Sequence, residues 1–446
     1  MLSAYAKTFT NQKVGFIGLG VSNLPVLRIL ANAGAVCSVR DKKNLRDNPS
    51  FAELEQEGIV FRCGEDYLEN IDEDVLFLSP AVRPDLPALA EAKARGVRLT
   101  NEMQEFFLHC PCPIIGITGS DGKTTTTTLT AKLLEASGHR VHLGGNIGKN
   151  LLSTLDDIQK DDFAVVELSS FQLFKMNRSP AIAAVTNLSP NHLDWHVNMQ
   201  EYADAKENIF AFQDENGVLV LNKDDEYAHE YAKKARGRIK WTSGLEKADV
   251  WFDDNGIYRG DKLIVRDEDI LVVGRHNRYN FAQAICLTEG FATDDAIREV
   301  ARTFGGVEHR CEFVREKDGV RYYNSSIDSS PTRTAACLTS FKQKVVVICG
   351  GYDKHIPLEP LGELFVHHAK HAVLCGATAE KIENVLKSVG YTDYTRTDDF
   401  VQAVQIASSH AAQGDCVVLS PAAASFDMFV NFAQRGETFK KLVKEL

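Results

Sequence analysis

The chain has 446 residues, of which 44% are hydrophobic and 25% charged, and its formal net charge is -11 at pH 7. This length and composition predict a globular protein of about two to four domains. The acidic balance excludes broad nucleic-acid binding, and no segment approaches the roughly 20 apolar residues that span a bilayer.

The N-terminal segment, Met1 to Gln12, has no charged stretch followed by an apolar core. We therefore expect neither a signal peptide nor a membrane anchor. Ten cysteines are scattered along the chain without the spacing of a disulfide framework or a zinc site. Reduced thiols in a cytoplasmic protein are the expected state.

Three short apolar runs end in glycine and lead into a helical pattern; they begin at Val14, Ile114 and Val345. Each is typical of the βα unit of a parallel sheet. We therefore predict an α/β fold of three domains, at 1–102, 103–306 and 307–446, each with a mostly parallel sheet flanked by helices.

The first run leads into Gly18-Leu-Gly20-Val-Ser22-Asn23, and Asp41 follows about twenty residues later. This is close to the fingerprint of a dinucleotide site, but Asn23 stands in place of the third glycine. On this pattern alone the first domain is Rossmann-like and its ligand is a dinucleotide or another nucleotide.

The second run carries the strongest motif, a strand followed by Gly116-Ile-Thr-Gly119-Ser120-Asp121-Gly122-Lys123-Thr124-Thr125. Glycines let backbone N–H groups converge on phosphate oxygens, and the start of a helix adds partial positive charge. We expect Lys123 to reach the terminal phosphates and the Thr124 hydroxyl to bind Mg²⁺. Residues 124–128 are all threonine, a poor helix former, which indicates that something other than helix propensity keeps them there.

Two later side chains are candidates for the metal site beside this phosphate loop. Glu167 ends the apolar strand that begins at Phe163, and His192 follows the strand at 183–187. The carboxyl ends of parallel strands meet at one edge of a sheet, and ATP sites supply one or two carboxylates to Mg²⁺. A loop histidine without a ligand is the competing interpretation of His192.

Together these segments resemble the Mur ligases. The resemblance rests on the phosphate loop, Gly144-Gly-Asn146-Ile-Gly148, Glu167-Leu-Ser-Ser-Phe-Gln-Leu173 and the His192 segment. Leu419-Ser-Pro-Ala-Ala-Ala-Ser425-Phe-Asp427 and Phe432-Ala-Gln-Arg-Gly436 narrow it to members that add D-glutamate. It covers the chain from Gly18 to the C-terminus.

The resemblance implies a Rossmann-like first domain for a UDP-linked substrate, a central P-loop ATPase-like domain and a Rossmann-like C-terminal domain for the amino acid. It implies that ATP phosphorylates the carboxylate of UDP-N-acetylmuramoyl-L-alanine and that the amine of D-glutamate attacks the acyl phosphate, in peptidoglycan precursor synthesis. It also implies ATP and Mg²⁺ as cofactors and a cytoplasmic monomer. The alternatives are a related Mur-type or folylpolyglutamate-type amide ligase, or a nucleotide-gated binding protein without ligase activity.

The resemblance also assigns roles to single residues. Lys123, Glu167, His192 and Lys206 are the expected catalytic residues, and Lys206 would carry CO₂ as a carbamate beside Thr124, Glu167 and His192 at Mg²⁺. The remaining expected contacts are Gly119, Ser120, Asp121, Gly122, Thr125, Asn280, Arg310 and Asp328 for ATP; Ser22, Asn23, Arg40, Asp41, Ser79 and Asn146 for the UDP substrate, with Asn146 also beside ATP; and Ser329, Lys354, Ser425 and Phe432 for D-glutamate.

Several residues depart from the pattern that such ligases often show. Asn191 and Trp195 stand where an aspartate and an arginine often flank the histidine. In the segment that often reads N-D-S-K-A-T-N-P, the aspartate is replaced by Ser325 and the lysine by Ile327. Asp328 is expected to substitute for the lost carboxylate at the ATP ribose.

Overall fold

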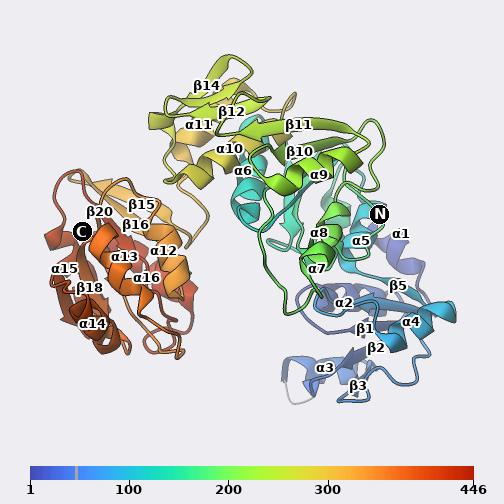
Figure 1. Ribbon diagram of the computed structural model, residues 1–446. Coiled ribbons are helices and arrows are strands. Elements are labelled where there is room, and N and C mark those ends of the chain that lie inside the picture. Colours follow the sequence, from blue (N-terminus) through green and yellow to red (C-terminus); the bar gives the residue numbers. More distant parts are fainter. Residues whose placement is uncertain (46–48) are drawn as a thin grey trace. The chain divides into compact units, whose positions relative to one another are not determined.

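The computed structural model describes residues 1–45 and 49–446, and its strands form three separate sheets (Figure 1). The chain divides into two compact units. The first comprises Met1–Asp253, Ile257–Lys262 and Tyr279–Ile297, and the second comprises Asp254–Gly256, Leu263–Arg278 and Arg298–Leu446. The first unit thus holds the sheet of the predicted first domain and most of the sheet of the second.

The first sheet has five parallel strands in the order β3-β2-β1-β4-β5. The strand order reverses between β1 and β4, and this is where sheets of this kind bind ligands at their carboxyl edge. The elements are α1 (Leu2–Lys7), β1 (Lys13–Ile17), α2 (Asn23–Asn32), β2 (Val36–Asp41), α3 (Pro49–Gln56), β3 (Val60–Cys63), β4 (Val75–Leu78), α4 (Pro87–Ala94), β5 (Arg98–Thr100) and α5 (Glu102–His109).

Alternation along β1 and β4 builds an apolar core on each face of this sheet, because successive strand residues point to opposite faces. Phe16 and Phe77 stack with ring centroids 5.2 Å apart in the core that includes Leu27 of α2. Ile17 belongs to the opposite core, with Leu89 of α4. Both faces are therefore covered by helices, as a parallel sheet requires.

The second sheet has nine strands in the order β14-β13-β12-β11-β10-β9-β6-β8-β7. The carboxyl ends of β8, β6 and β9 lie side by side, since these strands pair in parallel. The elements are β6 (Ile114–Thr118), α6 (Lys123–Ala136), β7 (Val141–Gly145), η2 (Leu152–Asp157), β8 (Phe163–Glu167), α7 (Ser170–Leu173), β9 (Ile182–Val185), α8 (Met199–Glu207), β10 (Val218–Asn222), α9 (Glu226–Lys234), β11 (Arg238–Ser243), β12 (Val250–Asp253), β13 (Gly256–Arg259), β14 (Lys262–Arg266), η3 (Asp267–Asp269), α10 (Arg275–Leu287) and α11 (Asp294–Thr303).

The first two sheets share one apolar core, which explains why they belong to one compact unit. Phe16 of β1, Phe106 of α5, Leu152 of η2 and Val166 of β8 are all members of this core. At the seam, Glu102 is only 5% exposed, and its carboxylate accepts a hydrogen bond from the backbone N–H of Leu152 at 3.2 Å. Burial raises the pKa of Glu102 to about 7.

Glu102→Gln is expected to stabilise the first unit in a pH-dependent way. A pKa near 7 in the folded state, against 4.5 for the free side chain, means that ionisation of Glu102 opposes folding. That penalty is absent below pH 4.5, grows through the window from 4.5 to 7 and is complete above it. Glutamine keeps an acceptor for Leu152 but cannot ionise, so unfolding at pH 8 should require about 3 kcal/mol more than in the wild type.

Urea unfolding at pH 4.5, 6 and 8 measures this difference. Glu91→Gln, on the exposed face of α4, is the matched control and should leave the pH dependence unchanged. A gain for Glu102→Gln that stays the same at all three pH values would contradict the burial argument.

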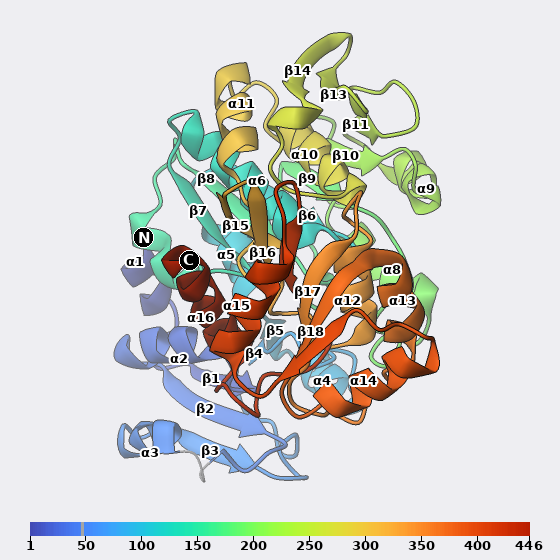
Figure 2. The ribbon, with the colours of Figure 1, turned by 90° about the vertical axis from the view of Figure 1, so that its left-hand side faces the viewer.

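The third sheet has six strands in the order β15-β16-β20-β17-β18-β19, and only the β15/β16 pair is antiparallel. Helices α12, α13 and α14 cover one face and α15 and α16 the other (Figure 2). The elements are β15 (Glu312–Lys317), β16 (Val320–Asn324), α12 (Pro331–Leu338), β17 (Val345–Cys349), α13 (Pro360–His368), β18 (Ala369–Cys375), α14 (Ala379–Ser388), β19 (Tyr394–Thr397), α15 (Phe400–His410), β20 (Cys416–Leu419) and α16 (Phe432–Glu445).

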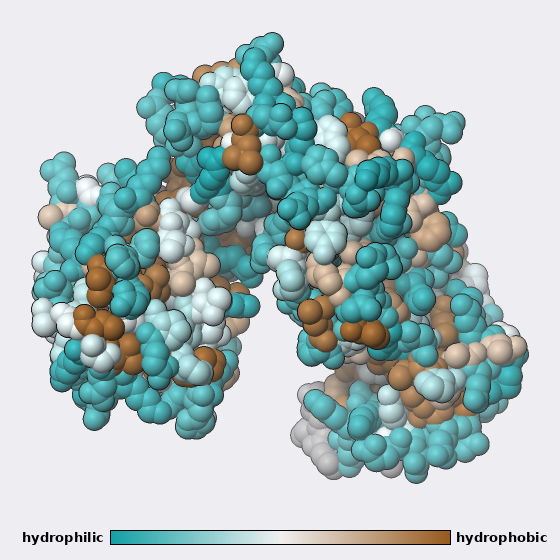
Figure 3. Space-filling view, viewed as in Figure 1, coloured by the Kyte–Doolittle hydropathy of each residue, from teal (hydrophilic) through white to brown (hydrophobic). Residues whose placement is uncertain are grey.

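The predicted fold class, with three mostly parallel sheets flanked by helices, is confirmed. The domain boundaries at 102 and 306 stay a prediction: each sheet lies within one predicted range, yet the middle range contributes residues to both compact units. All ten cysteines are free, and no helix in the described part of the chain could cross a membrane. Hydrophobic side chains form only small separate groups on the face in Figure 3.

Candidate functional site

The phosphate loop lies between β6 and α6, and α6 begins at Lys123, as the sequence predicts. Two of its residues must be glycine. Gly119 has φ +146° and Gly122 has φ +77°, and a Cβ at these positions would overlap the side chains of Thr186 and Asn280, respectively. The loop is thus shaped by close packing against β9's end and α10, and its backbone is free to approach a phosphate.

Polar groups hold the loop in place around its lysine. The Lys123 ammonium donates to the carbonyls of Gly119 at 2.9 Å and Ser120 at 2.8 Å. The Ser120 hydroxyl donates to the Ser189 carbonyl at 2.9 Å, and the backbone N–H of Asp121 donates to the Asn187 side chain at 3.0 Å. The ammonium therefore already lies over the loop that would receive a polyphosphate.

The threonine run is accommodated by bonds within the helix. Thr128 and Thr130 donate to the carbonyls of Thr124 and Thr126, each at 2.8 Å, a local pattern by which threonine satisfies its hydroxyl in a helix. Thr124 and Thr125 lie in the first turn of α6, beside the loop. Asn280 of α10 lies against the same turn, where its side-chain oxygen accepts from Thr126 at 3.3 Å.

A buried carboxylate and a buried lysine side chain flank the loop. Glu167, at the end of β8, is 2% exposed; its Oε1 accepts from the Asn146 amide at 2.8 Å, while its buried Oε2 has no hydrogen-bond partner. Lys206 of α8 is 1% exposed, and its Nζ donates to the Gly119 carbonyl at 2.8 Å and the Thr118 hydroxyl at 3.2 Å. Asn146, Glu167 and Lys206 are thus brought to one place.

The resemblance assigns Lys206 to this site, but the burial of its side chain could not be seen in the sequence. The sequence shows only a polar residue on an amphipathic helix, whereas the structure buries its amine with no ion-pair partner within 4.0 Å in the described part of the chain. Burial and then the charge of Lys123 hold the pKa of Lys206 well below its usual range. A neutral amine there is open to reaction with CO₂, which an ammonium is not.

His192 lies at the rim of the same site, in the left-handed backbone region with φ +54°. Its ring contacts the edge of Phe171, with centroids 4.9 Å apart. Desolvation by its neighbours, and then the charges of Lys123 and Lys206, lower the pKa of His192. The imidazole is therefore neutral at neutral pH, the form that binds a metal ion.

An arginine that sequence reasoning missed joins the two halves of the first unit. Arg83, in the loop after β4, forms a bidentate ion pair with Glu201 at 2.9 and 3.0 Å and donates to the Trp195 carbonyl at 2.9 Å. Its guanidinium lies 4.9 Å from the Trp195 ring and 4.8 Å from the Phe174 ring, and Trp195 donates to the Ala81 carbonyl at 3.2 Å. The loop at 79–83 and the His192 segment are thereby held as one body.

The loops after β1 and β4 meet where the first sheet's strand order reverses. A Cβ on Gly18 would lie 2.9 Å from the Ser79 Cβ, so the two loops are in direct contact. Ser22 precedes α2 and its hydroxyl caps no backbone N–H. The Asp41 carboxylate accepts from the backbone N–H of Leu19 at 3.4 Å. Asp41 and Ser79 thus both lie against the loop after β1 that leads to Ser22, and the contact of these three residues with the UDP substrate stays a prediction.

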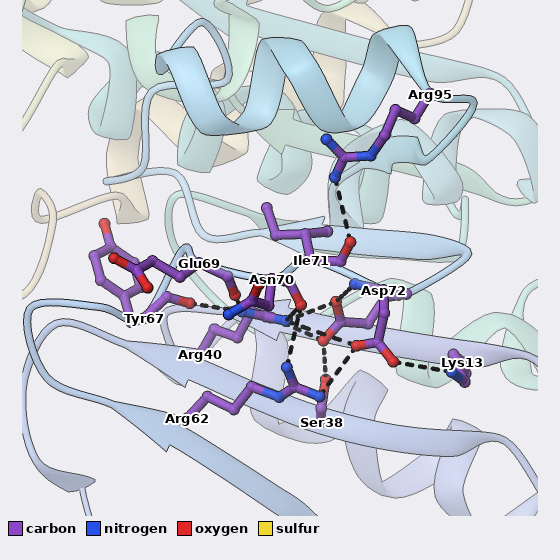
Figure 4. A network of polar contacts seen from close by, with 11 residues as sticks. Lys13, Ser38, Arg40, Arg62, Tyr67, Glu69, Asn70, Ile71, Asp72 and Arg95 are labelled. Carbon is purple, nitrogen blue, oxygen red and sulfur yellow. Dashed lines mark hydrogen bonds and ion pairs between the residues drawn. The ribbon is translucent and has the colours of Figure 1, made fainter.

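The expectation that the Arg40 side chain contacts the UDP substrate needs correction. Arg40 is fully buried, pairs with Glu73 at 2.8 Å and 3.0 Å, and donates to three backbone carbonyls in the segment 67–70 (Figure 4). The N–H groups of its guanidinium therefore bond to other parts of the protein and do not face a ligand. Burial raises the pKa of Glu73, but hydrogen bonds from Arg40 and Ser38 more than offset this and leave the pKa below its usual value. Arg40 is a structural residue that holds the 67–73 segment under β2.

The expectation that the Asn23 side chain contacts the UDP substrate also needs correction. It is fully buried, and its amide donates to the carbonyls of Ile17, Gly18 and Phe77. It therefore ties the carboxyl ends of β1 and β4 together and does not face a diphosphate.

A cleft of about 1010 Å³ opens at the seam of the two sheets in the first unit. Ser79 and Pro80 from the loop after β4 line it on one side, and Phe171 and Gln172 of α7 line it on the other. A substrate bound at the first sheet can therefore extend toward the segment that follows Glu167.

In the second unit, a pocket of about 370 Å³ brings together all four residues expected for the amino acid, Ser329, Lys354, Ser425 and Phe432. Phe432 is 41% exposed, so it is not a core residue. The pocket lining also includes Ile327, Arg333, Ala424, Phe426, Asn431 and Arg435, which sequence reasoning missed.

Two residues of the second unit were expected at ATP. Arg310 is exposed, and its contact with ATP stays a prediction. Asp328 is only 5% exposed, and its carboxylate accepts from the Ser420 hydroxyl at 2.8 Å. Burial raises the pKa of Asp328 to about 6. The expectation that Asp328 contacts the ATP ribose directly is therefore wrong, because this carboxylate is buried inside the unit and accepts from Ser420, which follows β20.

Comparison with known proteins identifies two matching sequence families. Residues 117–288 match the Mur ligase middle domain, and residues 309–423 match the glutamate ligase domain of Mur ligases. The curated protein UDP-N-acetylmuramoylalanine--D-glutamate ligase of Clostridium beijerinckii is 46% identical over 99% of this chain and 98% of its own length. The protein of the same name from Clostridium novyi is 45% identical over 98% of this chain and 97% of its own length.

Solved structures share the fold at low sequence identity. UDP-N-acetylmuramate-alanine ligase MurC of Thermotoga maritima has a TM-score of 0.59 at 17% identity and covers 97% of this chain and 99% of its own. The MurF ligase of the same organism, solved in complex with ADP, has a TM-score of 0.57 at 18% identity over 99% of this chain and 97% of its own.

Proposed function

The chain belongs to the Mur ligase family, and from this premise we propose that it is an ATP-dependent ligase that joins D-glutamate to UDP-N-acetylmuramoyl-L-alanine in peptidoglycan precursor synthesis. Relatives at 42–46% identity over essentially the full chain carry the name of that activity. The single structural observation that carries the proposal is the phosphate loop with Lys123, Glu167 and Lys206 gathered at its mouth. We further propose that the chain acts as a monomer in the cytoplasm.

The arrangement suits the activation of a carboxylate. A carboxylate oxygen attacks the γ-phosphorus of ATP, the bond to the β-phosphate oxygen breaks, and ADP leaves. The amine of D-glutamate then attacks the acyl carbon, loses a proton and expels inorganic phosphate as the amide forms. Both steps concentrate negative charge, so the task of the site is positioning and charge neutralisation. Lys123 and the N–H groups at the start of α6 are placed for that task.

The residues present fit a divalent cation at the same place. Glu167 keeps one buried oxygen without a partner, His192 is neutral, and Thr124 lies in the first turn of α6. We propose that these three, with Lys206 as its carbamate, hold Mg²⁺. The ion would supply charge neutralisation for the phosphates when bound. The carbamate replaces a buried amine, which would repel the ion whenever it is protonated, with a group that has two anionic oxygens.

An amino-acid panel tests the proposed function. The purified protein is incubated with UDP-N-acetylmuramoyl-L-alanine, ATP, Mg²⁺ and one amino acid at a time, and phosphate release and the ligated product are measured. D-Glutamate should support turnover, and L-glutamate, glycine and a diamino acid should give little. Preference for another amino acid would make the chain a different amide ligase, and phosphate release with none of them would favour a nucleotide-gated binding protein.

A further inference from the structure

The amino-acid pocket of the second unit has an unbalanced charge. Its lining contains three cations, Arg333, Lys354 and Arg435, and no carboxylate. Two of the three are exposed at the pocket, since Arg333 and Lys354 both have open side chains. A pocket of about 370 Å³ with this lining selects a small, negatively charged ligand.

Arg435 is not free to bind such a ligand. It is 1% exposed, and its guanidinium donates to the Ser326 hydroxyl and to the carbonyls of Ser326, Ala423 and Ala424 at 2.9 to 3.1 Å. Four of its five N–H groups are therefore used. Arg435 joins the segment after β16 to the segment after β20 and so shapes the floor of the pocket.

Lys354 and Arg333 remain as cations that a ligand can reach. The Lys354 ammonium lies 6.0 Å from the centre of the Phe426 ring, and no ion pair of Lys354 or Arg333 lies within 4.0 Å among residues 1–45 and 49–446. Arg333 makes a single long hydrogen bond, from Nη1 to the Ile327 carbonyl at 3.5 Å. This bond is weak, so the guanidinium can turn to a better acceptor at little cost.

We propose that Arg333 binds one carboxylate of the amino-acid substrate while Lys354 binds the other, which makes Arg333 a specificity-determining residue. This inference rests on the proposed function, because D-glutamate is the substrate with two carboxylates. Two carboxylates opposite two reachable cations give charge balance in the pocket. A guanidinium can also hold a carboxylate through two parallel N–H···O bonds, which fixes its orientation.

The position of Arg333 explains how the pocket keeps its charge although residue 327 is isoleucine. Ile327 and Arg333 both line the pocket, and the guanidinium of Arg333 lies at the Ile327 carbonyl. Because both residues line the pocket, a lysine at position 327 and the arginine at position 333 are each able to supply a cation to it.

Four variants test this inference through steady-state kinetics with D-glutamate, ATP and UDP-N-acetylmuramoyl-L-alanine. Arg333→Ala should raise the KM for D-glutamate by about 10- to 100-fold, the range for loss of a charged hydrogen-bonded pair. The KM values for ATP and the UDP substrate should stay within about 2-fold of the wild type, since Arg333 lines the amino-acid pocket and not the cleft of the first unit. Arg333→Lys keeps the positive charge but cannot form two parallel N–H···O bonds to a carboxylate. It should therefore give a KM for D-glutamate between those of the wild type and Arg333→Ala.

The decisive variant is Arg333→Ala combined with Ile327→Lys, which returns the cation from the neighbouring position and should lower the KM for D-glutamate again. Arg396→Ala is the control, because Arg396 is an exposed arginine of β19 that lies outside the pocket and forms ion pairs with Glu380 and Glu383. It should leave all three KM values unchanged.

Three outcomes decide between the hypotheses. A KM for D-glutamate within about 2-fold of the wild type in Arg333→Ala overturns the inference and leaves the proposed function intact. A rise that neither charge-restoring variant recovers also overturns it, because Arg333 then acts through structure. If the wild-type protein prefers an amino acid with one carboxylate, both the proposed function and this inference are wrong.

Discussion

Lys123→Ala is expected to abolish ATP-dependent phosphate release, with a loss of at least about 10³-fold. The ammonium lies over the phosphate loop, where it bonds to two loop carbonyls, and polyphosphate would draw it to the terminal phosphates. Without it, negative charge that builds up during phosphoryl transfer is not neutralised. The fold should persist, because Lys123 contributes no apolar contact to the core.

Phosphate release with saturating substrates measures this loss. Lys132→Ala, an exposed lysine on the same helix α6, is the matched control and should keep wild-type turnover. Circular dichroism of both variants checks that the helix content is unchanged. Turnover of Lys123→Ala close to that of the wild type would remove the phosphate loop from the mechanism.

Lys206→Ala is expected to lose activity by at least about 10²-fold and to regain part of it when formate or acetate is added. The buried amine of Lys206 has its pKa held well below the usual range by burial, so it has the neutral form that the proposed reaction with CO₂ requires, in which the amine would lose a proton to give a carbamate. Removing the side chain leaves space beside Glu167 and the phosphate loop. A short carboxylate can enter that space and supply the two anionic oxygens.

The pattern across variants distinguishes this chemistry from a structural role. Formate or acetate should rescue Lys206→Ala but not Lys123→Ala, because the latter lacks a cation. Mass spectrometry of the wild type under native conditions with CO₂ should show the carbamate. Rescue of neither variant, together with a lowered unfolding temperature for Lys206→Ala, would show that Lys206 only fills the core.

The sequence was sufficient for features that depend on neighbours along the chain. The phosphate loop could be predicted because strand, glycines and helix follow one another, and α6 does begin at Lys123. Glu167 could be placed because it ends an apolar strand whose parallel neighbours fix its edge. The four amino-acid residues come together as the resemblance implied.

Burial, by contrast, depends on segments far apart in the chain. Arg40 ends a strand, as a ligand contact would, but Glu73 takes its guanidinium from thirty-three residues away. Lys206 lies on a helix with a polar surface pattern, and only the packing of α8 against β6 buries its amine. The roles of Arg83 and Arg333 could not be predicted from nearby residues, because the partners that give them these roles lie on other elements or in the substrate.

The contact between Arg83 and Trp195 restricts how this protein can change over generations. Arg83 lies between two aromatic rings and two carboxylates, so an arginine at position 195 would bring a second guanidinium against the first. Two guanidinium groups in contact repel each other, because both are positively charged. A sequence with arginine at 195 should therefore lack one at 83, and one with tryptophan at 195 should keep it. Across species, the residues at positions 83 and 195, which are 112 residues apart, should therefore change together.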